Sequence, residues 1–262
     1  MLIRSTWQFS VNESVTLPRS HHLGLVKDLH NRLDIRMGEE NIPSTTFSGI
    51  LGYCDRSGDF ITFLPNQVYT LTLNGLQESS SKAIANLDLG ESLEFLGAKF
   101  LVCDRQDQVT SYENLYTELV ANEPEITRKF ELNFLTPTAF AQNRTHLPLP
   151  VPHLMFRSWL ERWNHFAPIY LGSDDLLTYL TNYVTVTRHH IKTGTVHIHQ
   201  GQCTGFLGQV TIQAIGKVDP LLGNVAHLLV QYASFAGTGI KTRLSMGQTE
   251  NKIQKIGETQ NA

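Results

Sequence analysis

The sequence predicts an α+β protein of two tandem ferredoxin-like domains, each with the element order βαββαβ. Two observations support this prediction. Segments with strand spacing and helical spacing follow one another in that order within residues 1–103, and the same order recurs after residue 128. A polar connector, 104–128, lies between the halves, so we expect one domain over residues 1–124 and a second over residues 125–262.

The first half opens with an alternating segment in which Ile3, Trp7 and Phe9 share one parity, the pattern of a half-buried strand. Apolar residues at helical spacing then predict a helix over 22–33, with Ser20 as its N-cap. We also expect strands at 45–51, 59–64, 67–73 and 93–103, a helix at 79–87, and a short helix near 112–120 in the connector.

The second half repeats the pattern, beginning with a strand at 129–135 whose apolar residues lie on one side. The proline-rich segment 145–152 leads into a helix, and we interpret its Trp159 and Trp163 as core residues. The expected elements are helices at 153–166 and from 219 onward, strands at 184–190, 195–199 and 209–215, and a final strand beyond 247.

Composition limits the class of protein. A hydrophobic share of 41% in 262 residues is enough for ordinary cores, and the three cysteines show no CxxC spacing, which argues against a disulfide framework or a zinc knuckle. The amino terminus has no apolar signal region and no long apolar run follows. We therefore expect a cytoplasmic protein that does not bind a membrane.

Charge is distributed unevenly along the chain, although its net value is only -3. Residues 186–262 carry 7 Lys and Arg against 3 Asp and Glu, whereas residues 1–185 carry 14 against 21. A polyanionic partner needs a basic face rather than a basic average. The local excess in the second half keeps a nucleic-acid partner open despite the negative net charge.

The segment 228–247 is the most informative part of the chain. An apolar helical stretch runs into a loop that contains Gly237, Gly239, Lys241, Arg243 and Gly247. Glycines let successive N–H groups crowd around an anion, and Lys and Arg add charge, so such a loop suits a phosphate backbone. The alternative is a helix that stops at the first glycine and is followed by a β-turn.

Four stretches that together span most of the chain carry a family resemblance. They are LPRSHHLGLVKDLHNRLD (17–34), IPSTTFSGILG (42–52), FLTPTAFAQNRTHLPLPVPHLMFRSWLERWNHFAP (134–168) and the glycine-rich segment (228–247). Their order and spacing resemble the repeat-processing endoribonucleases of CRISPR systems, the sixth of the Cas protein families within the RAMP superfamily. The last two stretches are the more specific.

The resemblance implies two ferredoxin-like domains of the RNA-recognition-motif type and binding of CRISPR repeat RNA, as a hairpin or a single strand, in a basic cleft. It implies cleavage at one phosphodiester without a metal or other cofactor, to yield guide RNA. The nucleophile would be the ribose 2′-OH, and the products a 2′,3′-cyclic phosphate and a 5′-OH. Other Cas proteins of an effector complex are further possible partners.

Such a reaction needs a base for the 2′-OH proton, a cation for the phosphorane-like charge, and an acid for the leaving oxygen. His30 is the first candidate, because the last carbonyls of its helix favour a protonated imidazole. Lys27 lies one turn away and can address the same phosphate, and His22 is the second histidine candidate. In many relatives the catalytic histidine follows this helix, but residues 35–41 contain none.

The candidate RNA-binding residues are Arg19, His21, Arg188, His189, Lys192, Gly237, Gly239, Lys241, Arg243 and Gly247. Arg157 and Arg162 on the second-half helix are also within reach of a phosphate, and His197 and His199 share one strand face that contacts RNA or solvent. For each residue the alternative is an ordinary solvated or structural side chain.

Two other functions stay open at this point. One is a repeat-RNA-binding subunit that holds guide RNA in an effector complex without cutting it, which the missing histidine after the first helix favours. The other is a ferredoxin-like metabolite-binding protein whose glycine loop holds a nucleotide, but it leaves the first three family-like stretches unexplained.

Overall fold

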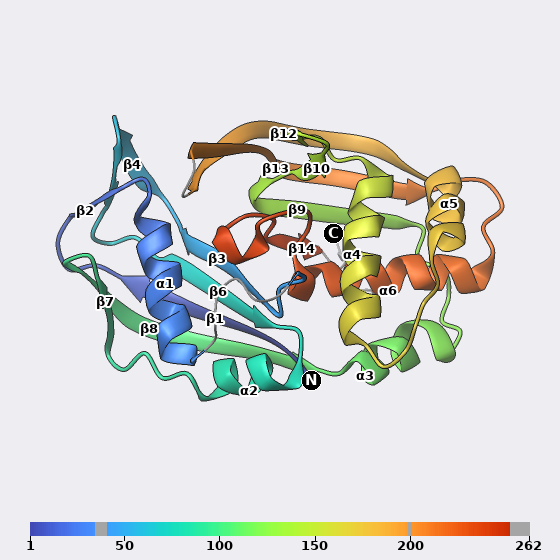
Figure 1. Cartoon of the computed structure of the whole chain (residues 1–262), viewed down its shortest axis with the longest axis horizontal. Coiled ribbons are helices and arrows are strands. Elements are labelled where there is room, and N and C mark those ends of the chain that lie inside the picture. The colour runs from blue at the N-terminus through green and yellow to red at the C-terminus, as the bar shows by residue number, and fades with distance from the viewer. Residues whose placement is uncertain (35–40, 199–200, 252–262) are drawn as a thin grey trace, which may run out of the picture.

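Two antiparallel sheets, each covered by helices on one face, lie side by side in the computed structural model, which describes residues 1–34, 41–198 and 201–251 (Figure 1). In each sheet the first strand of the βαββαβ unit lies in the middle, between the third and the fourth. This is the ferredoxin-like arrangement, so the predicted fold class is confirmed. Over the described residues, no helix combines the length and the apolar character needed to cross a membrane.

The N-terminal domain pairs its strands in the order β3-β6-β1-β8-β7. Its unit consists of β1 (Leu2–Ser10), α1 (His21–Leu33), β3 (Thr45–Leu51), β6 (Tyr69–Gly75), α2 (Glu78–Asn86) and β8 (Ala98–Thr110), with β7 (Ser92–Phe95) as an added edge strand. A small second sheet is formed by β2 (Val15–Pro18), β5 (Phe60–Phe63) and β4 (Cys54–Ser57).

The alternation in β1 sets the two faces of this sheet. Ile3, Trp7 and Phe9 are buried in the core that the sheet forms with α1 and α2, as the parity predicts. Arg4 and Thr6 point to the opposite face, away from α1 and α2 and toward the end of α6. Ser20 is the N-cap of α1 as expected, although its side chain makes no capping hydrogen bond.

The expected single strand at 93–103 is in fact the hairpin β7–β8, which turns at Leu96 and Gly97 with φ angles of 51° and 77°. Strand β8 continues to Thr110, well into the segment expected to be a connector. The helix expected there is present as α3 (Tyr112–Tyr116), which continues into a short π-helix, η1 (Thr117–Ala121).

The C-terminal domain pairs its strands in the order β12-β13-β9-β14. Its unit consists of β9 (Lys129–Thr138), α4 (Pro152–Phe166), β12 (Val184–Ile198), β13 (Gly201–Ala214), α6 (Pro220–Ala236) and β14 (Thr249–Asn251). Three further elements decorate it, namely the hairpin strands β10 (Phe140–Gln142) and β11 (Thr145–Leu147) and the helix α5 (Asp174–Tyr183). As predicted, Trp159 and Trp163 are fully buried.

The strands expected at 184–190 and 195–199 are one long strand, β12, which pairs with β13 along its whole length. Strands β12 and β13 form a hairpin, and β9 pairs only with its residues 206–213. The end of the hairpin where β12 meets β13 therefore extends beyond the sheet toward α1 of the other domain (Figure 1). The described residues do not include His199, Gln200 or the tail after residue 251. The hairpin therefore spans from one domain to the other.

Candidate nucleic-acid interface

The glycine-rich loop, which we define as residues 237–247, connects α6 to β14. Thr238 donates a backbone hydrogen bond to the Gly247 carbonyl oxygen at 2.8 Å, which closes the loop on itself. Ile240 donates to Ala139 at 3.0 Å and Gly247 donates to Pro137 at 3.1 Å, which fastens the loop to the end of β9. The loop is thus a built part of the domain.

The three glycines of this loop allow backbones to approach closely. A Cβ atom on Gly239 would lie 2.2 Å from the Ala139 carbonyl oxygen, and one on Gly247 would lie 2.1 Å from that of Thr238. Both residues, like Gly237, have positive φ angles and are buried. Their N–H groups donate to protein acceptors, so the expectation that the glycine backbone faces a phosphate is wrong.

Helix α4 supports the loop from below through Ser158 and Arg162. The Gly239 N–H donates to Ser158 Oγ at 2.9 Å, and Arg162 Nη2 donates to the Gly239 carbonyl oxygen at 2.6 Å. Arg162 Nη1 also donates to the carbonyl and hydroxyl oxygens of Ser158. Burial lowers the pKa of this guanidinium. Arg162, expected as a surface contact, therefore holds the loop, and this support was not foreseen from the sequence.

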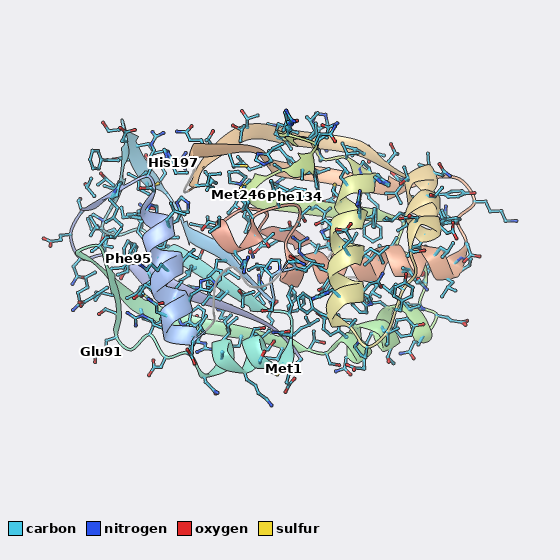
Figure 2. The ribbon with its side chains drawn as sticks, viewed as in Figure 1. Met1, Glu91, Phe95, Phe134, His197 and Met246 are labelled. Carbon is cyan, nitrogen blue, oxygen red and sulfur yellow. The ribbon has the colours of Figure 1, made fainter. Side chains whose placement is uncertain are left out.

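The loop presents side chains rather than backbone to its surroundings. Lys241 and Arg243 are half-buried, and Lys241 directly precedes a single 3₁₀ turn, η2 (Thr242–Leu244), which contains Arg243. This turn packs against β3 and α1 of the N-terminal domain, so the structure brings the basic end of the loop beside the helix that carries the candidate histidines. Met246 lies between the domains (Figure 2), buried against Cys203 and Val196 of the hairpin.

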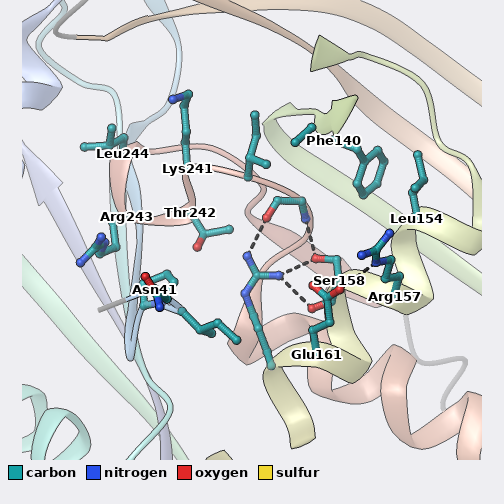
Figure 3. A pocket seen from close by; sticks show the side chains of 16 residues that line it. Asn41, Phe140, Leu154, Arg157, Ser158, Glu161, Lys241, Thr242, Arg243 and Leu244 are labelled. Carbon is teal, nitrogen blue, oxygen red and sulfur yellow. Dashed lines mark hydrogen bonds and ion pairs between the residues drawn. The ribbon is translucent and has the colours of Figure 1, made fainter. Parts of the chain in front are cut away.

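A pocket of about 700 Å³ opens beside the loop, between it, α4 and the segment Asn41–Pro43 (Figure 3). Figure 3 shows Asn41, Thr242 and Arg243 on one side of it and Arg157 on the other. Arg157 is exposed and pairs with Glu161 at 2.7 Å, an ion pair that raises the pKa of the arginine. The pocket is lined from both domains and carries several cations.

His30 does not lie at the surface. It is 2% exposed, its Nδ1 donates to the Val26 carbonyl oxygen at 2.8 Å, and its ring packs on Phe47 at a centroid distance of 4.7 Å. Lys27, by contrast, is exposed. The structure therefore places one of these two side chains in the core and the other at the surface, and their joint action on one phosphate stays a prediction.

The two histidines at the start of α1 are also buried. His21 donates from Nδ1 to the Pro18 carbonyl oxygen and packs against Phe63 and Phe95, and burial, aided by His22, lowers the pKa of His21 to about 4. His22 Nε2 lies 2.6 Å from the His197 carbonyl oxygen at the far end of the hairpin. Figure 2 shows His197 above α1, where the hairpin meets the N-terminal domain.

The remaining candidates are cations on the surface. Arg19 is exposed just before α1. Arg188, His189 and Lys192 are exposed on β12, the edge strand of the C-terminal sheet. Because side chains alternate along a strand, Arg188 and His189 lie on opposite faces of β12. The hairpin thus offers basic groups to both sides, with no one of them buried.

Comparison with known families places these features in a wider context. Residues 132–249, from β9 to β14 and including the glycine-rich loop, match the family model described as CRISPR-associated endoribonuclease Cas6. A curated Cas6 endoribonuclease from Streptococcus thermophilus is 26% identical over 129 residues, which cover 49% of this chain and 52% of the relative. One from Mycobacterium tuberculosis is 30% identical over 121 residues, which cover 46% of this chain and 38% of the relative.

The matched region thus spans about half or less of the length of these curated relatives. Solved structures extend the similarity to nearly the whole chain. A Cas6 product complex shares the fold with a TM-score of 0.72 at 19% identity, covering 96% of this chain and 100% of that one. A RAMP protein described as binding different RNA substrates shares it with a TM-score of 0.60 at 12% identity, covering 96% and 99%.

Because these solved structures share only 19% and 12% sequence identity with this chain, they show the similarity of the fold alone. The family match comes from the sequence of the second half, and the solved structures add the fold. The second half of the chain carries the sequence pattern of the CRISPR-associated endoribonuclease Cas6 family and the described chain has the fold of its members, which confirms the resemblance seen in the sequence.

Proposed function

We propose that the chain is an endoribonuclease that cuts CRISPR precursor transcripts within the repeat to yield guide RNAs. One observation carries the proposal: the segment that matches the Cas6 family contains the glycine-rich loop, and the basic end of this loop packs against α1. This packing supports the proposal because such a cut requires cations for the phosphate and a group that transfers protons, and the loop carries Lys241 and Arg243 while α1 carries the candidate histidines. We propose that it acts in the cytoplasm, alone or with other Cas proteins.

Cleavage proceeds without a metal ion. The 2′-OH next to the cut attacks the phosphorus, the 5′ oxygen leaves, and a 2′,3′-cyclic phosphate and a 5′-OH result. Lys241 and Arg243 bind the phosphate, and Gly237, Gly239 and Gly247 act indirectly by shaping the loop that carries them.

Surface cations outside the loop hold the rest of the RNA. Arg19 lies before α1, and Arg188, His189 and Lys192 lie along the hairpin that reaches toward α1. Such phosphate contacts position an RNA strand without reading its bases. Recognition of the repeat then depends on hairpin shape and a few base edges.

The proton transfers fall to the histidines of α1, with His30 first, His22 second and Lys27 as the accompanying cation. Since His30 is 2% exposed, its use requires the segment around it to open when RNA binds. Replacing His30 by Ala is expected to lower the cleavage rate between about 10²-fold and 10⁴-fold, the usual contribution of one acid or base. His165→Gln, an exposed histidine on α4, is the matched control.

The decisive assay incubates the purified protein with repeat RNA in EDTA and, separately, with RNA carrying one 2′-deoxy substitution at the cut. Cleavage that survives EDTA and stops with the deoxy substrate supports the mechanism. Cleavage that EDTA abolishes would rule out the metal-independent route. A His30→Ala protein that cuts at full rate would exclude His30 and turn attention to His22.

A second candidate function is a subunit that binds repeat RNA without cutting it. The burial of His21, His22 and His30 favours it, because none of these rings contacts bulk solvent freely. Tight binding of repeat RNA with intact RNA after long incubation, in EDTA and in Mg²⁺ alike, would establish this function instead.

A further inference from the structure

The pocket beside the glycine-rich loop has a use of its own. Its volume of about 700 Å³ falls in the range of sites that hold a small organic ligand. Its walls come from the loop, from α4 and from Asn41–Pro43. Some of its lining side chains, such as Arg157, make no hydrogen bond to the loop among the described contacts.

Two buried polar atoms of residues that line this pocket have no hydrogen-bond partner among the described residues. Arg162 is 8% exposed, and although both of its Nη atoms are bonded, its Nε–H has no acceptor. Thr242 is 1% exposed, and its Oγ1 likewise has no partner. Because neither atom has accessible surface, a ligand in the pocket reaches the more exposed cations of the lining rather than these two groups.

The electrostatics of the pocket specify an anion. Four cations line it, namely Arg157, Arg162, Lys241 and Arg243, against one described carboxylate, Glu161. That carboxylate is already paired with Arg157. A phosphate accepts several charge-assisted hydrogen bonds at once and therefore suits this set better than a single carboxylate does.

Part of the pocket lining is apolar. The apolar side chains are those of Phe140, Leu154, Ile240, Pro43 and Leu244. A ligand that fills both parts must join a flat apolar group to a phosphate across a short distance. A nucleotide has that form, with an aromatic base at one end and a phosphate at the other.

We propose that this pocket is a subsite for one unpaired nucleotide of the bound RNA, with its base against Phe140 and Ile240 and its phosphate at Arg157. This inference rests on the proposed RNA-binding function and deepens it. The duplex part of a hairpin is too wide for such a pocket, so the nucleotide must come from a single-stranded or flipped position.

The test uses a twelve-nucleotide single-stranded RNA with one 4-thiouridine, and measures its Kd by fluorescence anisotropy over a series of salt concentrations. Ala141→Trp fills the pocket from an exposed position without removing a charge. Arg157→Ala removes one exposed cation. Lys82→Ala, which breaks an exposed i,i+4 pair with Glu78 outside the pocket, is the matched control for Arg157. Ala121→Trp, on η1, is the control for the added bulk.

We expect Ala141→Trp to weaken binding about tenfold, and Arg157→Ala to weaken it and to lower the slope of log Kd against log salt by about 0.7, the value for one single-strand phosphate contact. Both controls should bind like the wild type. On irradiation, the 4-thiouridine should crosslink to the peptides that contain Phe140 or Ile240, and Ala141→Trp should abolish that crosslink.

Wild-type affinity in both pocket variants, with crosslinks elsewhere, would overturn the subsite while leaving RNA binding intact. If the wild type binds neither this RNA nor repeat RNA, the proposed function and the subsite both fail. Titration with uridine monophosphate tests whether the pocket binds a free nucleotide instead of a nucleotide within RNA. A free nucleotide that binds the wild type but not Ala141→Trp, without RNA binding, would reassign the pocket to a mononucleotide.

Discussion

Arg4 and Glu250 join the two sheets through an ion pair of 2.6 Å between Nη2 and Oε1. Arg4 lies on the face of β1 that points away from α1 and α2, where it stands opposite Asn74 and Gln108, and Glu250 lies on β14 at the edge of the other sheet. Arg4 Nη1 also donates to the Ser234 carbonyl oxygen at 2.9 Å, at the end of α6. One side chain of the first strand thus holds the last helix and the last strand.

Replacing Arg4 by Ala should lower the free energy of unfolding by about 2 kcal/mol. The guanidinium is almost fully buried, and its loss leaves the Ser234 carbonyl without this charged donor, whereas Glu250 is partly exposed and can be solvated. Urea unfolding measures the change. Arg32→Ala, which removes the exposed pair with Asp28, should cost less than about 0.5 kcal/mol. Equal losses of unfolding free energy in the two variants would show that the contacts of Arg4 with Ser234 and Glu250 do not stabilise the protein more than a surface ion pair does.

The glycine-rich loop predicts a strong position dependence for Gly→Ala substitutions. Gly239 has a φ of 79° and no room for a Cβ, so Gly239→Ala should cost about 3 kcal/mol through backbone strain and collision with the Ala139 carbonyl. Gly216 has a φ of 74° with open space around it, and Gly216→Ala should cost only about 1 kcal/mol. Thermal unfolding compares the two. A Gly216 variant as unstable as the Gly239 variant would show that strain alone matters and that close packing does not.

The loop also shows what sequence patterns reveal and what they leave out. The glycines marked a special backbone, and the structure gives each a positive φ. The direction of the Gly239 and Gly247 N–H groups depends on their acceptors, Ser158 and Pro137, which lie far earlier in the chain, and no local spacing encodes those contacts. A loop fastened to a distant strand and a loop open to an anion therefore have the same sequence signature.

Helices and strands with a clear period were predictable for the same physical reason. The apolar stripes of α1, α4 and α6 and the alternation in β1 reflect burial within one element. The turn at Leu96 was not predictable, because a leucine with positive φ carries none of the usual turn signals. The break expected between 190 and 195 is absent from β12, and Gly194 there leaves room for Leu207, since a Cβ would lie 2.5 Å from Leu207 Cδ2.

The spacing of residues in α1 indicates that His30 is buried. His22, Val26 and His30 follow one another at intervals of four residues, so they form one row along α1, and all three are buried. His30 is a catalytic candidate because it lies near the carbonyl end of its helix, which favours a protonated imidazole. The helical row, continued by Leu33, indicates burial instead.

The depressed pKa of His21 makes the stability of the protein dependent on pH. The folded protein keeps this ring neutral down to a pH of about 4, whereas the unfolded chain takes up a proton near pH 6.5. The unfolded state therefore binds more protons between these values, and stability falls as the pH is lowered from about 6.5 to about 4, by about 3 kcal/mol for this group in total.

Urea unfolding at a series of pH values tests this dependence. His21→Leu removes the titrating group but keeps an apolar contact for Phe63 and Phe95, so its stability should fall less over the same interval. His165→Gln, on the exposed end of α4, should retain the wild-type pH dependence. Parallel curves for the wild type and His21→Leu would assign the effect to other groups.

The contact between His22 and His197 predicts how firmly the hairpin is held. His22 Nε2 lies 2.6 Å from the backbone oxygen of His197, so the ring can donate a hydrogen bond across the domain boundary. The hairpin extends past its sheet, and local hydrogen exchange should report the loss of this bond. In His22→Phe, amide exchange in residues 194–198 and 201–205 should rise on the order of fivefold, as expected for about 1 kcal/mol. His22→Gln keeps an N–H donor and should show a smaller rise, while the amides of β9 should not change in either variant. Unchanged exchange at the hairpin end in His22→Phe would mean that other contacts hold the hairpin against α1.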